Sequence, residues 1–362
     1  MRHVAILIPA SPVSAFFSQI AAFSRALKSL RWVRWRPSLH VLMGGEVDNA
    51  ALQKWLPYLD DVAITLLPKS QFLREGIWAQ YDGLFHLLLQ DADVILRMDA
   101  DTLPIAEFEE VLDRVAETGC VAGVIEHFPF STSVGLARSE DWQGLARDLT
   151  GAPLNLAFRY TLLPDPEWPA PFYVNFGAVF FPGRVWREFS ELYLRFRPQL
   201  VDRLGESYFA GQVAFALATA KMDVAAWALP MRYNFPNDSR AVSLHPDELS
   251  RVSVFHYLRT SIYDRHRIFT NSVEYSRFLA LPLEGVDLVF QQAVIRILGS
   301  EFPFQPLEVR AALTRSAAQK RIDDPLSRQT YEATAAAHRA AVGPALAGVE
   351  AELAALTLNE AR

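Results

Sequence analysis

Short apolar runs alternate with amphipathic stretches along the first third of the chain. Between the runs, apolar residues recur every three or four positions, which is the spacing of one face of a helix. Such an alternation of strands and helices is typical of a mainly parallel sheet flanked by helices. The pattern predicts strands at 4–8, 39–43, 62–67, 94–98 and 121–125, and helices at 16–30, 52–59, 77–88 and 107–118.

The pattern is less regular in the middle of the chain and returns afterwards. Proline, glycine and tryptophan accumulate between 128 and 171 while the periodicity fades, so we expect loops that cover a ligand there. After Phe304, amphipathic segments predict helices that form a separate layer for packing or self-association. Between residue 171 and Phe304, the pattern predicts strands at 172–181, 225–229 and 252–255, and helices at 186–196 and 206–221.

The composition is that of an ordinary globular protein. Of 362 residues, 51% are hydrophobic and 21% are charged, and the net charge of −6 gives no electrostatic basis for binding nucleic acid. The single cysteine, Cys120, excludes an intrachain disulfide, and we interpret it as a small core residue. The apolar run at 4–8 is too short for a secretory signal, and no apolar stretch approaches the roughly 18 residues of a membrane span. We therefore expect a soluble, cytoplasmic protein.

The segment Arg31-Trp32-Val33-Arg34-Trp35-Arg36 combines basic and aromatic side chains. One interpretation is peripheral contact with a membrane surface or with phosphate. The favoured alternative is a plain connection between a helix and a strand, whose arginines extend their charged ends into solvent.

Two carboxylates separated by one residue follow the predicted strand at 94–98. Asp99 and Asp101 fall where a buried strand ends, and in an open parallel sheet ligands bind beyond the carboxyl ends of the strands. A turn beginning at Asp99 would aim both side chains at one cation, and hard oxygen ligands suit Mg²⁺ or Mn²⁺ beside a diphosphate. The alternative is a pair of solvated turn aspartates.

Further segments of the chain follow this pair in a recognisable order. They are Tyr173-Val174-Asn175-Phe176-Gly177-Ala178, then Gly211-Gln212-Val213-Ala214 before Leu229-Pro230-Met231-Arg232-Tyr233-Asn234, and finally Phe255-His256-Tyr257. Together with Met98-Asp99-Ala100-Asp101, this set resembles the GT-A-fold glycosyltransferases. The second half of the chain is most similar to the retaining enzymes of family 8, which include glycogenin and bacterial galactosyltransferases.

The resemblance extends over about the first three quarters of the chain, and it implies a fold and a domain organisation. The fold is a Rossmann-like, mainly parallel mixed sheet flanked by helices. Residues 1–303 would form the glycosyltransferase domain, with 1–125 as its nucleotide-binding half and 126–303 as its acceptor half. Residues 304–362 would form a C-terminal helical extension.

The resemblance also implies a function: metal-dependent transfer of a sugar from a nucleoside-diphosphate sugar to a hydroxyl group of a carbohydrate, lipid or protein. UDP is favoured over GDP. Asp99 and Asp101 would bind the cation with the diphosphate, and His256 would complete the metal site. Imidazole is a borderline ligand, so this set favours Mn²⁺ over Mg²⁺. Asn175 and Gln212 would face the donor sugar, and with Asp101 they form the predicted catalytic set.

The nucleotide side departs from the family pattern. The family usually has an acidic, Asn- or Tyr-containing segment after the first strand, whereas this chain has Pro9-Ala10-Ser11-Pro12. The Gly and Lys expected shortly after the His are absent, and Gly211 stands where an Asp usually precedes the Gln. Arg259, Arg265 or Arg267 could supply the lost positive charge, since a guanidinium grips phosphate with two donors. The predicted donor-binding residues are Pro9, Ala10, Arg74, Asp99, Asp101 and Arg259.

The stereochemical outcome is predicted from Gln212. An inverting transferase needs a general base near the sugar, normally an Asp or Glu, and an amide is a poor base. We therefore predict retention, with Gln212 stabilising the positive charge that develops at the anomeric carbon. An inverting enzyme would direct attention to Asp141, Glu167 or Glu206 as the base.

The stretch 128–171 is expected to border the acceptor. Its side chains Trp142, Arg159 and Trp168 would form part of the wall, because aromatic faces stack on sugar rings and loops beyond a sheet reach the cleft.

Two other functions stay open. Asp99 and Asp101 followed by Thr102 are similar to the haloacid-dehalogenase-like phosphatases, whose first Asp is a nucleophile, although there the Thr normally comes two residues after the second Asp. A degenerate glycosyltransferase domain that binds a nucleotide or a partner without turnover is the non-enzymatic alternative. The chain contains no Gly-x-Ser-x-Gly nucleophile elbow, and one cysteine cannot build a zinc-like Cys/His cluster.

Overall fold

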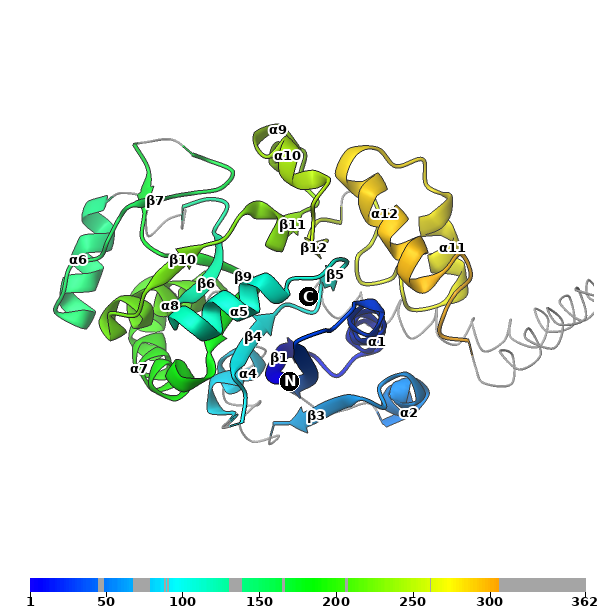
Figure 1. Cartoon of the computed structure of the whole chain (residues 1–362), viewed down its shortest axis with the longest axis horizontal. Helices are drawn as coiled ribbons and strands as arrows, with labels where there is room; N and C mark the ends of the chain where they lie inside the picture. The colour runs from blue at the N-terminus through cyan, green and yellow to red at the C-terminus, as the bar shows by residue number, and fades with distance from the viewer. Residues whose placement is uncertain are drawn as a thin grey trace, which may run out of the picture.

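A seven-stranded mixed sheet runs through the centre of the protein (Figure 1). The computed structural model describes residues 1–44, 49–67, 79–87, 89, 91–129, 139–164, 167–205, 208–260 and 262–305. The strand order is β10-β6-β9-β4-β1-β2-β3, and only β9 of these seven strands runs antiparallel to its neighbours. The predicted α/β class with a mainly parallel sheet is confirmed. The strands are β1 (Arg2–Ala10), β2 (Trp35–Met43), β3 (Val62–Leu66), β4 (Val94–Met98), β6 (Val121–Ile125), β9 (Val174–Pro182) and β10 (Ala226–Ala228).

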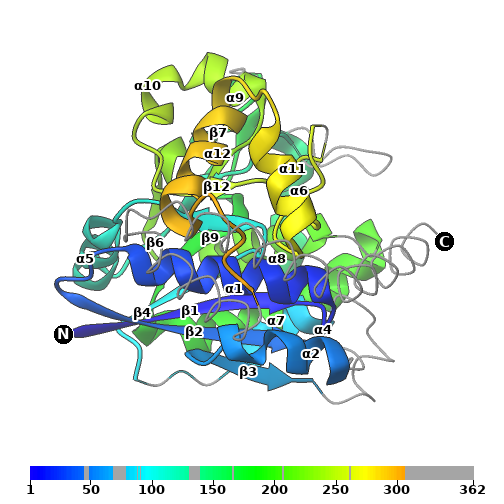
Figure 2. The same cartoon turned by 90° about the vertical axis from the view of Figure 1, so that its right-hand side faces the viewer.

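Helices cover both faces of the sheet. Alternate residues of β1 enter two separate hydrophobic clusters, as the pleat of a strand requires: Ile6 and Ile8 pack with α1 and α5, whereas Ala5 and Leu7 pack with α7 and α8. Figure 2 shows α1 in front of the sheet and α7 and α8 behind it. The helices of these layers are α1 (Ser14–Ser29), α2 (Asn49–Trp55), α4 (Ala79–Gly83), α5 (Glu109–Thr118), α6 (Ser139–Thr150), α7 (Trp186–Leu204) and α8 (Tyr208–Met222).

A three-stranded sheet brings a distant part of the chain back to the end of β4. Its strands are β5 (Thr102–Pro104), β11 (Phe235–Pro236) and β12 (Val254–His256). β12 pairs antiparallel with β5 and places His256 opposite Thr102. Short helices flank this sheet, and two longer ones follow it: α9 (Ser239–Leu244), α10 (Pro246–Leu249), α11 (Ser272–Ala280) and α12 (Gly285–Leu298).

Most predicted elements lie where the apolar pattern placed them. The predicted helix at 107–118 is α5, and Gly119 ends it in the left-handed conformation with φ 73°. Cys120 is buried, as predicted. The helix predicted at 77–88 is observed as α4 followed by a short 3₁₀ turn at Leu84–His86, and its positions 77, 78 and 88 lie outside the described residues. Pro9 and Ala10, expected in the turn after the first strand, are the last residues of β1.

Loops are expected throughout 128–171, but Ser139–Thr150 form helix α6, so the expectation is wrong for this segment. Trp142, Leu145 and Ala146 recur at helical spacing and are buried in the same cluster as α7 and α8. The short helix was missed because prolines and glycines on either side dilute the apolar periodicity. Residues 130–138, 165 and 166 lie outside the described part of the chain.

The basic and aromatic segment 31–36 is packed against α5. The Glu109 carboxylate accepts hydrogen bonds from the backbone N–H groups of Val33, Arg34 and Trp35, and the Arg34 guanidinium lies 2.7 Å from Asp113. The Trp35 side chain is buried. These contacts favour the interpretation as a connection between α1 and β2.

Residues 306–362 lie outside the described part of the chain, so the helical extension and its role in self-association stay predictions. Phe304 packs its ring against Trp55 and Tyr58, and so belongs to the described core. The boundary at 303 also stays a prediction. Among the described residues, no helix is both long and apolar enough to cross a membrane.

Candidate active site

A cavity of about 530 Å³ opens where three strands end. Pro9 at the end of β1, Asp99 after β4 and Glu126 after β6 all border it. The carboxyl ends of strands are where ligands bind in open α/β sheets. Other lining residues come from α1, α4, β9, α8, β12 and the segment after β12, and they include Phe16, Gln19, Tyr81, Asn175, Phe209, Gln212, His256, Arg259, Arg265 and His266.

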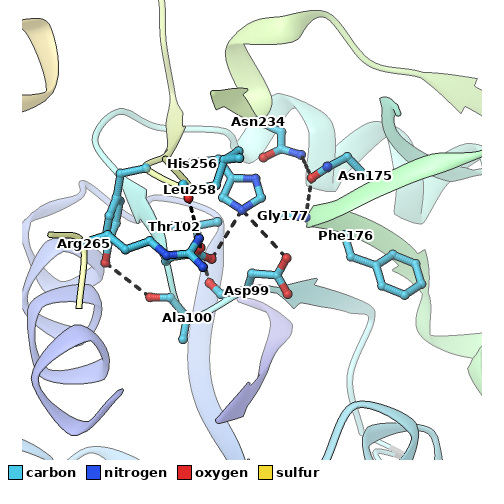
Figure 3. A network of polar contacts seen from close by, with 12 residues as sticks. Asp99, Ala100, Thr102, Asn175, Phe176, Gly177, Asn234, His256, Leu258 and Arg265 are labelled. Atoms are coloured by element: carbon cyan, nitrogen blue, oxygen red, sulfur yellow. Dashed lines mark hydrogen bonds and ion pairs between the residues drawn. The ribbon is translucent and has the colours of Figure 1, made fainter. Parts of the chain in front are cut away.

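Asp99, Asp101 and His256 meet at one point of this cavity (Figure 3). The turn between β4 and β5 is held by Thr102, whose N–H and hydroxyl both donate to the Asp99 carbonyl at 3.2 and 2.7 Å. The Tyr257 N–H donates to the Asp101 carbonyl at 3.0 Å, which fixes the end of β12 beside the turn. The local sequence sets the turn, and the pairing of β12 with β5 supplies the histidine.

The cluster fits a divalent cation. The possible ligand atoms of the three residues all lie within 4.8 Å of one another, with His256 Nε2 3.3 Å from Asp101 Oδ1 and 3.9 Å from Asp99 Oδ2. Two carboxylate oxygens and one imidazole nitrogen suit Mn²⁺ or Mg²⁺. His256 Nδ1 is buried without a hydrogen-bond partner in the described part of the chain, and it lies close to Gly177.

Positive side chains balance the carboxylates of the cluster. Arg97 lies 2.8 Å from Asp99, and the Arg265 guanidinium donates to the Asp101 carboxylate. Burial tends to raise the pKa of Asp101, but His256 and Arg265 outweigh burial and hold that pKa well below its usual range. For His256, burial tends to lower the pKa, and Asp101 and Asp99 together raise it above its ordinary value. A cation entering the cluster therefore competes with a proton on His256 and with Arg265.

Glu126 is a functional candidate that sequence reasoning missed. Its Oε2 accepts hydrogen bonds from Asn175 Nδ2 at 3.0 Å and Gln212 Nε2 at 2.8 Å, and its Oε1 accepts from the His127 N–H at 2.9 Å. Burial raises the pKa of Glu126, and the three hydrogen bonds oppose that rise. Glu126 directly follows an apolar strand, which is the same signal that pointed to Asp99, so the sequence could have found it.

Asn175 and Gln212 lie together, as the resemblance implied. An ionised Glu126 carboxylate only accepts hydrogen bonds, so both amide nitrogens turn toward it. The Asn175 Oδ1 then accepts from the Gly177 N–H at 2.9 Å and from Asn234 Nδ2 at 2.7 Å. The Gln212 Oε1 is left buried without a partner among the described residues.

Only some of the predicted donor-binding residues border the cavity. Pro9 and Arg259 border the cavity, whereas Ala10 is buried in the core and Arg74 lies outside the described residues. Of the three arginines considered as phosphate partners, Arg265 is the one at the metal cluster. Arg259 pairs with Asp238, and Arg267 lies 3.2 Å from Glu274, away from the cavity.

Gly211 has no room for the missing aspartate. A β-carbon at this position would lie 2.9 Å from the Tyr193 hydroxyl, which donates to Asp82 at 2.7 Å. The tyrosine of α7 fills the space that a side chain at 211 would need.

The expectation that Trp142 forms part of the acceptor wall is wrong. Trp142 is fully buried and packs against Tyr173 in the core, because α6 carries it inward. Arg159 and Trp168 are not among the lining residues, while Phe128 and Pro129 are.

Two of the three candidate bases of the inverting alternative do not border the cavity, and the third is untested. Asp141 and Glu167 do not line the cavity, and Glu206 lies outside the described residues. Of the carboxylates that line the cavity, Glu126 is the one outside the metal cluster.

Comparisons with known proteins return glycosyltransferases among solved structures. No family model and no curated protein matches the sequence. Mouse xyloside xylosyltransferase 1 matches with 11% identity and a TM-score of 0.45, covering 71% of this chain and 98% of that one. The galactosyltransferase LgtC, in complex with donor and acceptor sugar analogs, matches with 16% identity and a TM-score of 0.48, covering 85% and 99%. The bifunctional glycosyltransferase WbbM matches with 12% identity and a TM-score of 0.40, covering 71% and 46%.

These structures belong to the class of enzyme that the sequence motifs resemble. At these identities, with TM-scores below 0.5, the likenesses establish no activity for this chain.

Proposed function

We propose that the protein is a metal-dependent glycosyltransferase. It would move a sugar from a nucleoside-diphosphate sugar, with UDP favoured over GDP, to a hydroxyl group of a carbohydrate, lipid or protein. The observation that carries this proposal is the convergence of Asp99, Asp101 and His256 in a cavity that also holds Glu126 and Gln212. A cation site and a set of hydrogen-bonding side chains in one cavity is what a sugar diphosphate needs.

Asp99, Asp101 and His256 would hold the cation, Mn²⁺ before Mg²⁺. When bound, the ion supplies Lewis-acid neutralisation of the charge on the departing diphosphate. Arg265 would exchange its contact with Asp101 for phosphate oxygens, since its guanidinium already reaches the cluster. Arg259 borders the same cavity and would add a second positive charge there.

Glu126, Asn175 and Gln212 would face the donor sugar. In the transfer step the bond from the anomeric carbon to the diphosphate oxygen breaks, and a bond to the acceptor oxygen forms. The acceptor proton passes to the leaving phosphate. Gln212 presents its carbonyl oxygen, held in that orientation by Glu126, and this partial negative charge would stabilise the positive charge at the anomeric carbon. This arrangement supports retention of configuration.

A screen of nucleotide sugars for metal-dependent hydrolysis or transfer tests the proposal. We expect release of the nucleoside diphosphate from at least one donor with Mn²⁺, loss of that release with chelator, and loss in Asp101→Asn. Asp91→Asn, an exposed aspartate before β4, is the matched control and should retain activity. A folded protein that turns over no donor with Mn²⁺ would contradict the proposal.

Proton NMR of the product tests the stereochemistry separately. From an α-linked donor we expect an α-linked product. A β-linked product would contradict the role given to Gln212 and would point to Glu126 as the general base.

The contact between Arg265 and Asp101 favours a second candidate, a degenerate domain that binds a nucleotide without turnover. A guanidinium that stays in the cluster would take the place of the cation. Calorimetry separates the two: the degenerate protein would bind UDP equally with Mn²⁺ and with chelator, and the screen would find no turnover.

A further inference from the structure

The two ends of the cavity differ in chemistry. Figure 3 shows Asp99 and His256 between Arg265 on one side and Asn175 on the other. Beyond Asn175 lie Glu126 and Gln212, whose polar groups suit sugar hydroxyls. At Arg265 the lining is largely apolar and aromatic: Gln19 bonds to the Arg265 carbonyl, the ring of Phe16 contacts that of His266, and Pro9 also borders the cavity. In a nucleoside-diphosphate sugar the diphosphate separates a flat base from a polyhydroxy ring, so the apolar end is the one that suits the base.

Gln19 is the unusual residue of this apolar end. It lies on α1, its side chain is only 1% exposed, and it borders the cavity. Its Nε2 donates to the backbone carbonyl of Arg265 at 3.1 Å. A carbonyl can only accept, so the amide orientation is fixed with the nitrogen toward Arg265. The Oε1 is buried with no hydrogen-bond partner in the described part of the chain.

An unpartnered buried carbonyl oxygen is costly, and a ligand that donates an N–H removes that cost. Pro9 and Ala10, at the end of β1, have no polar side chain that could pair with a base. Gln19 lies on α1, the helix that follows β1, and it borders the cavity.

We propose that Gln19 selects the nucleobase by accepting the N3–H of uracil through its Oε1. This inference rests on the proposed function, because it assumes a nucleotide donor. Cytosine carries a lone pair instead of a proton at N3, so it would face the Gln19 oxygen with like polarity. Guanine offers two neighbouring N–H groups that a carboxylate pairs best, and the described lining of this end contains no carboxylate beyond the metal cluster. Uracil in a nucleotide has a single N–H group, at N3, and Gln19 Oε1, the one acceptor atom of that side chain, can pair with it.

The experiment is calorimetry in Mn²⁺ with four ligands: UDP, CDP, N3-methyl-UDP and pyrophosphate. The wild-type protein should bind UDP about 10- to 100-fold more tightly than CDP or N3-methyl-UDP, the range expected for one buried hydrogen bond. In Gln19→Met this preference should shrink to about twofold or less, while pyrophosphate affinity should change by no more than about twofold. Pyrophosphate lacks a base, so it reports whether loss of the Arg265 contact has disturbed the phosphate site.

Gln199→Met is the matched control. Gln199 is an exposed glutamine of α7 and lies outside the lining of the cavity, so this variant should keep the full preference for UDP. If Gln19→Met does not fold, equal binding of UDP and N3-methyl-UDP by the wild-type protein still overturns the inference.

Two results would overturn the inference while leaving the proposed function intact. One is equal wild-type affinity for UDP, CDP and N3-methyl-UDP, and the other is a preference for UDP that survives in Gln19→Met. Failure of the folded wild-type protein to bind UDP, CDP, GDP or ADP with Mn²⁺ would instead overturn the proposed function, and this inference with it.

Discussion

At the scale of single residues, Glu126 organises the end of the cavity assigned to the sugar. The Glu126 carboxylate accepts hydrogen bonds from the amide nitrogens of Asn175 and Gln212. The carbonyl oxygen of each amide must therefore point away from Glu126. Gln212 therefore owes the direction of its carbonyl oxygen to Glu126. We therefore expect Glu126 to affect turnover as strongly as the residues that the motifs identified.

Replacing Glu126 by Gln should separate turnover from nucleotide binding. The new amide would bring N–H groups against those of Asn175 and Gln212, so both would reorient. We expect kcat for donor hydrolysis to fall roughly 100-fold or more, the usual effect of losing a polar group that acts on the transition state. UDP affinity measured by calorimetry should stay within about twofold, because the proposed nucleotide site lies at the other end of the cavity.

Glu117→Gln is the matched control, since Glu117 is an exposed residue of α5. Its kcat should equal that of the wild-type protein. An unchanged kcat in Glu126→Gln would remove Glu126 from the mechanism.

His127 gives the protein a predicted dependence of stability on pH. Burial, together with the nearby charge of His256, lowers the pKa of His127 to about 3, while its unfolded value is near the usual ~6.5. As the pH falls below about 6.5, the unfolded chain takes up a proton that the folded chain refuses, so stability is lost between about pH 6.5 and 3. At pH 5 the loss from this one residue amounts to about 2 kcal/mol.

Urea unfolding of wild-type protein and His127→Asn at pH 7 and pH 5 measures this effect. The asparagine can keep the contact with Thr161, which the His127 Nδ1 makes at 2.8 Å. All other titrating groups are shared, so the variant should lose about 2 kcal/mol less than the wild-type protein over this interval. Equal losses would show that His127 titrates normally in the folded state.

At the scale of elements, β9 packs closely against the end of β12 beside the candidate metal site. Gly177 of β9 is buried beside Asn234 and His256. A β-carbon at this position would come closer to Asn234 Oδ1 and His256 Nδ1 than van der Waals contact allows. The glycine in the segment Asn175-Phe176-Gly177 is therefore required by packing against His256, the proposed metal ligand.

Gly177→Ala should push His256 out of place. We expect a loss of about 1–3 kcal/mol in unfolding free energy, as for other overpacked sites, and weaker binding of Mn²⁺ by calorimetry. Gly144→Ala is the matched control: its β-carbon meets nothing within 4 Å in α6, so it should bind Mn²⁺ normally and be as stable or slightly more stable. Mn²⁺ binding by Gly177→Ala at the wild-type affinity would contradict the role of this contact.

The sequence predicted elements well where their pattern is local. Strand β4 and helix α5 are each described by their own apolar spacing and, for α5, by Gly119. Helix α6 was missed because its apolar face is short and lies among prolines and glycines. The pairing of β12 with β5 could not be read from periodicity, since it joins segments about 150 residues apart and depends on tertiary packing.

The same contrast holds for the candidate site. Asp99 and Asp101 are adjacent in sequence, and the family resemblance added His256, Asn175 and Gln212. Glu126 carried the signal of a carboxylate after a buried strand, but it matched no motif. Gln19 carried no signal at all, because an amide on an amphipathic helix becomes notable only when the fold leaves its oxygen buried without a partner.

At the scale of the whole molecule, the sheet places the three strand ends of β1, β4 and β6 around one cavity. Each contributes a different part of the proposed chemistry: the nucleotide at β1, the cation at β4 and the sugar at β6. The chain has a net charge of −6, so attraction of a diphosphate depends on the local cation and on Arg265 and Arg259. The proposed function therefore requires that nucleotide binding depend on the cation.

Calorimetry of UDP binding in the presence of Mn²⁺ and in the presence of chelator tests that claim most directly. The account predicts measurable binding with Mn²⁺, none with chelator, and none in Asp101→Asn with Mn²⁺, while Asp91→Asn binds as the wild-type protein does. Equal affinity with Mn²⁺ and with chelator would contradict a metal role for Asp99, Asp101 and His256.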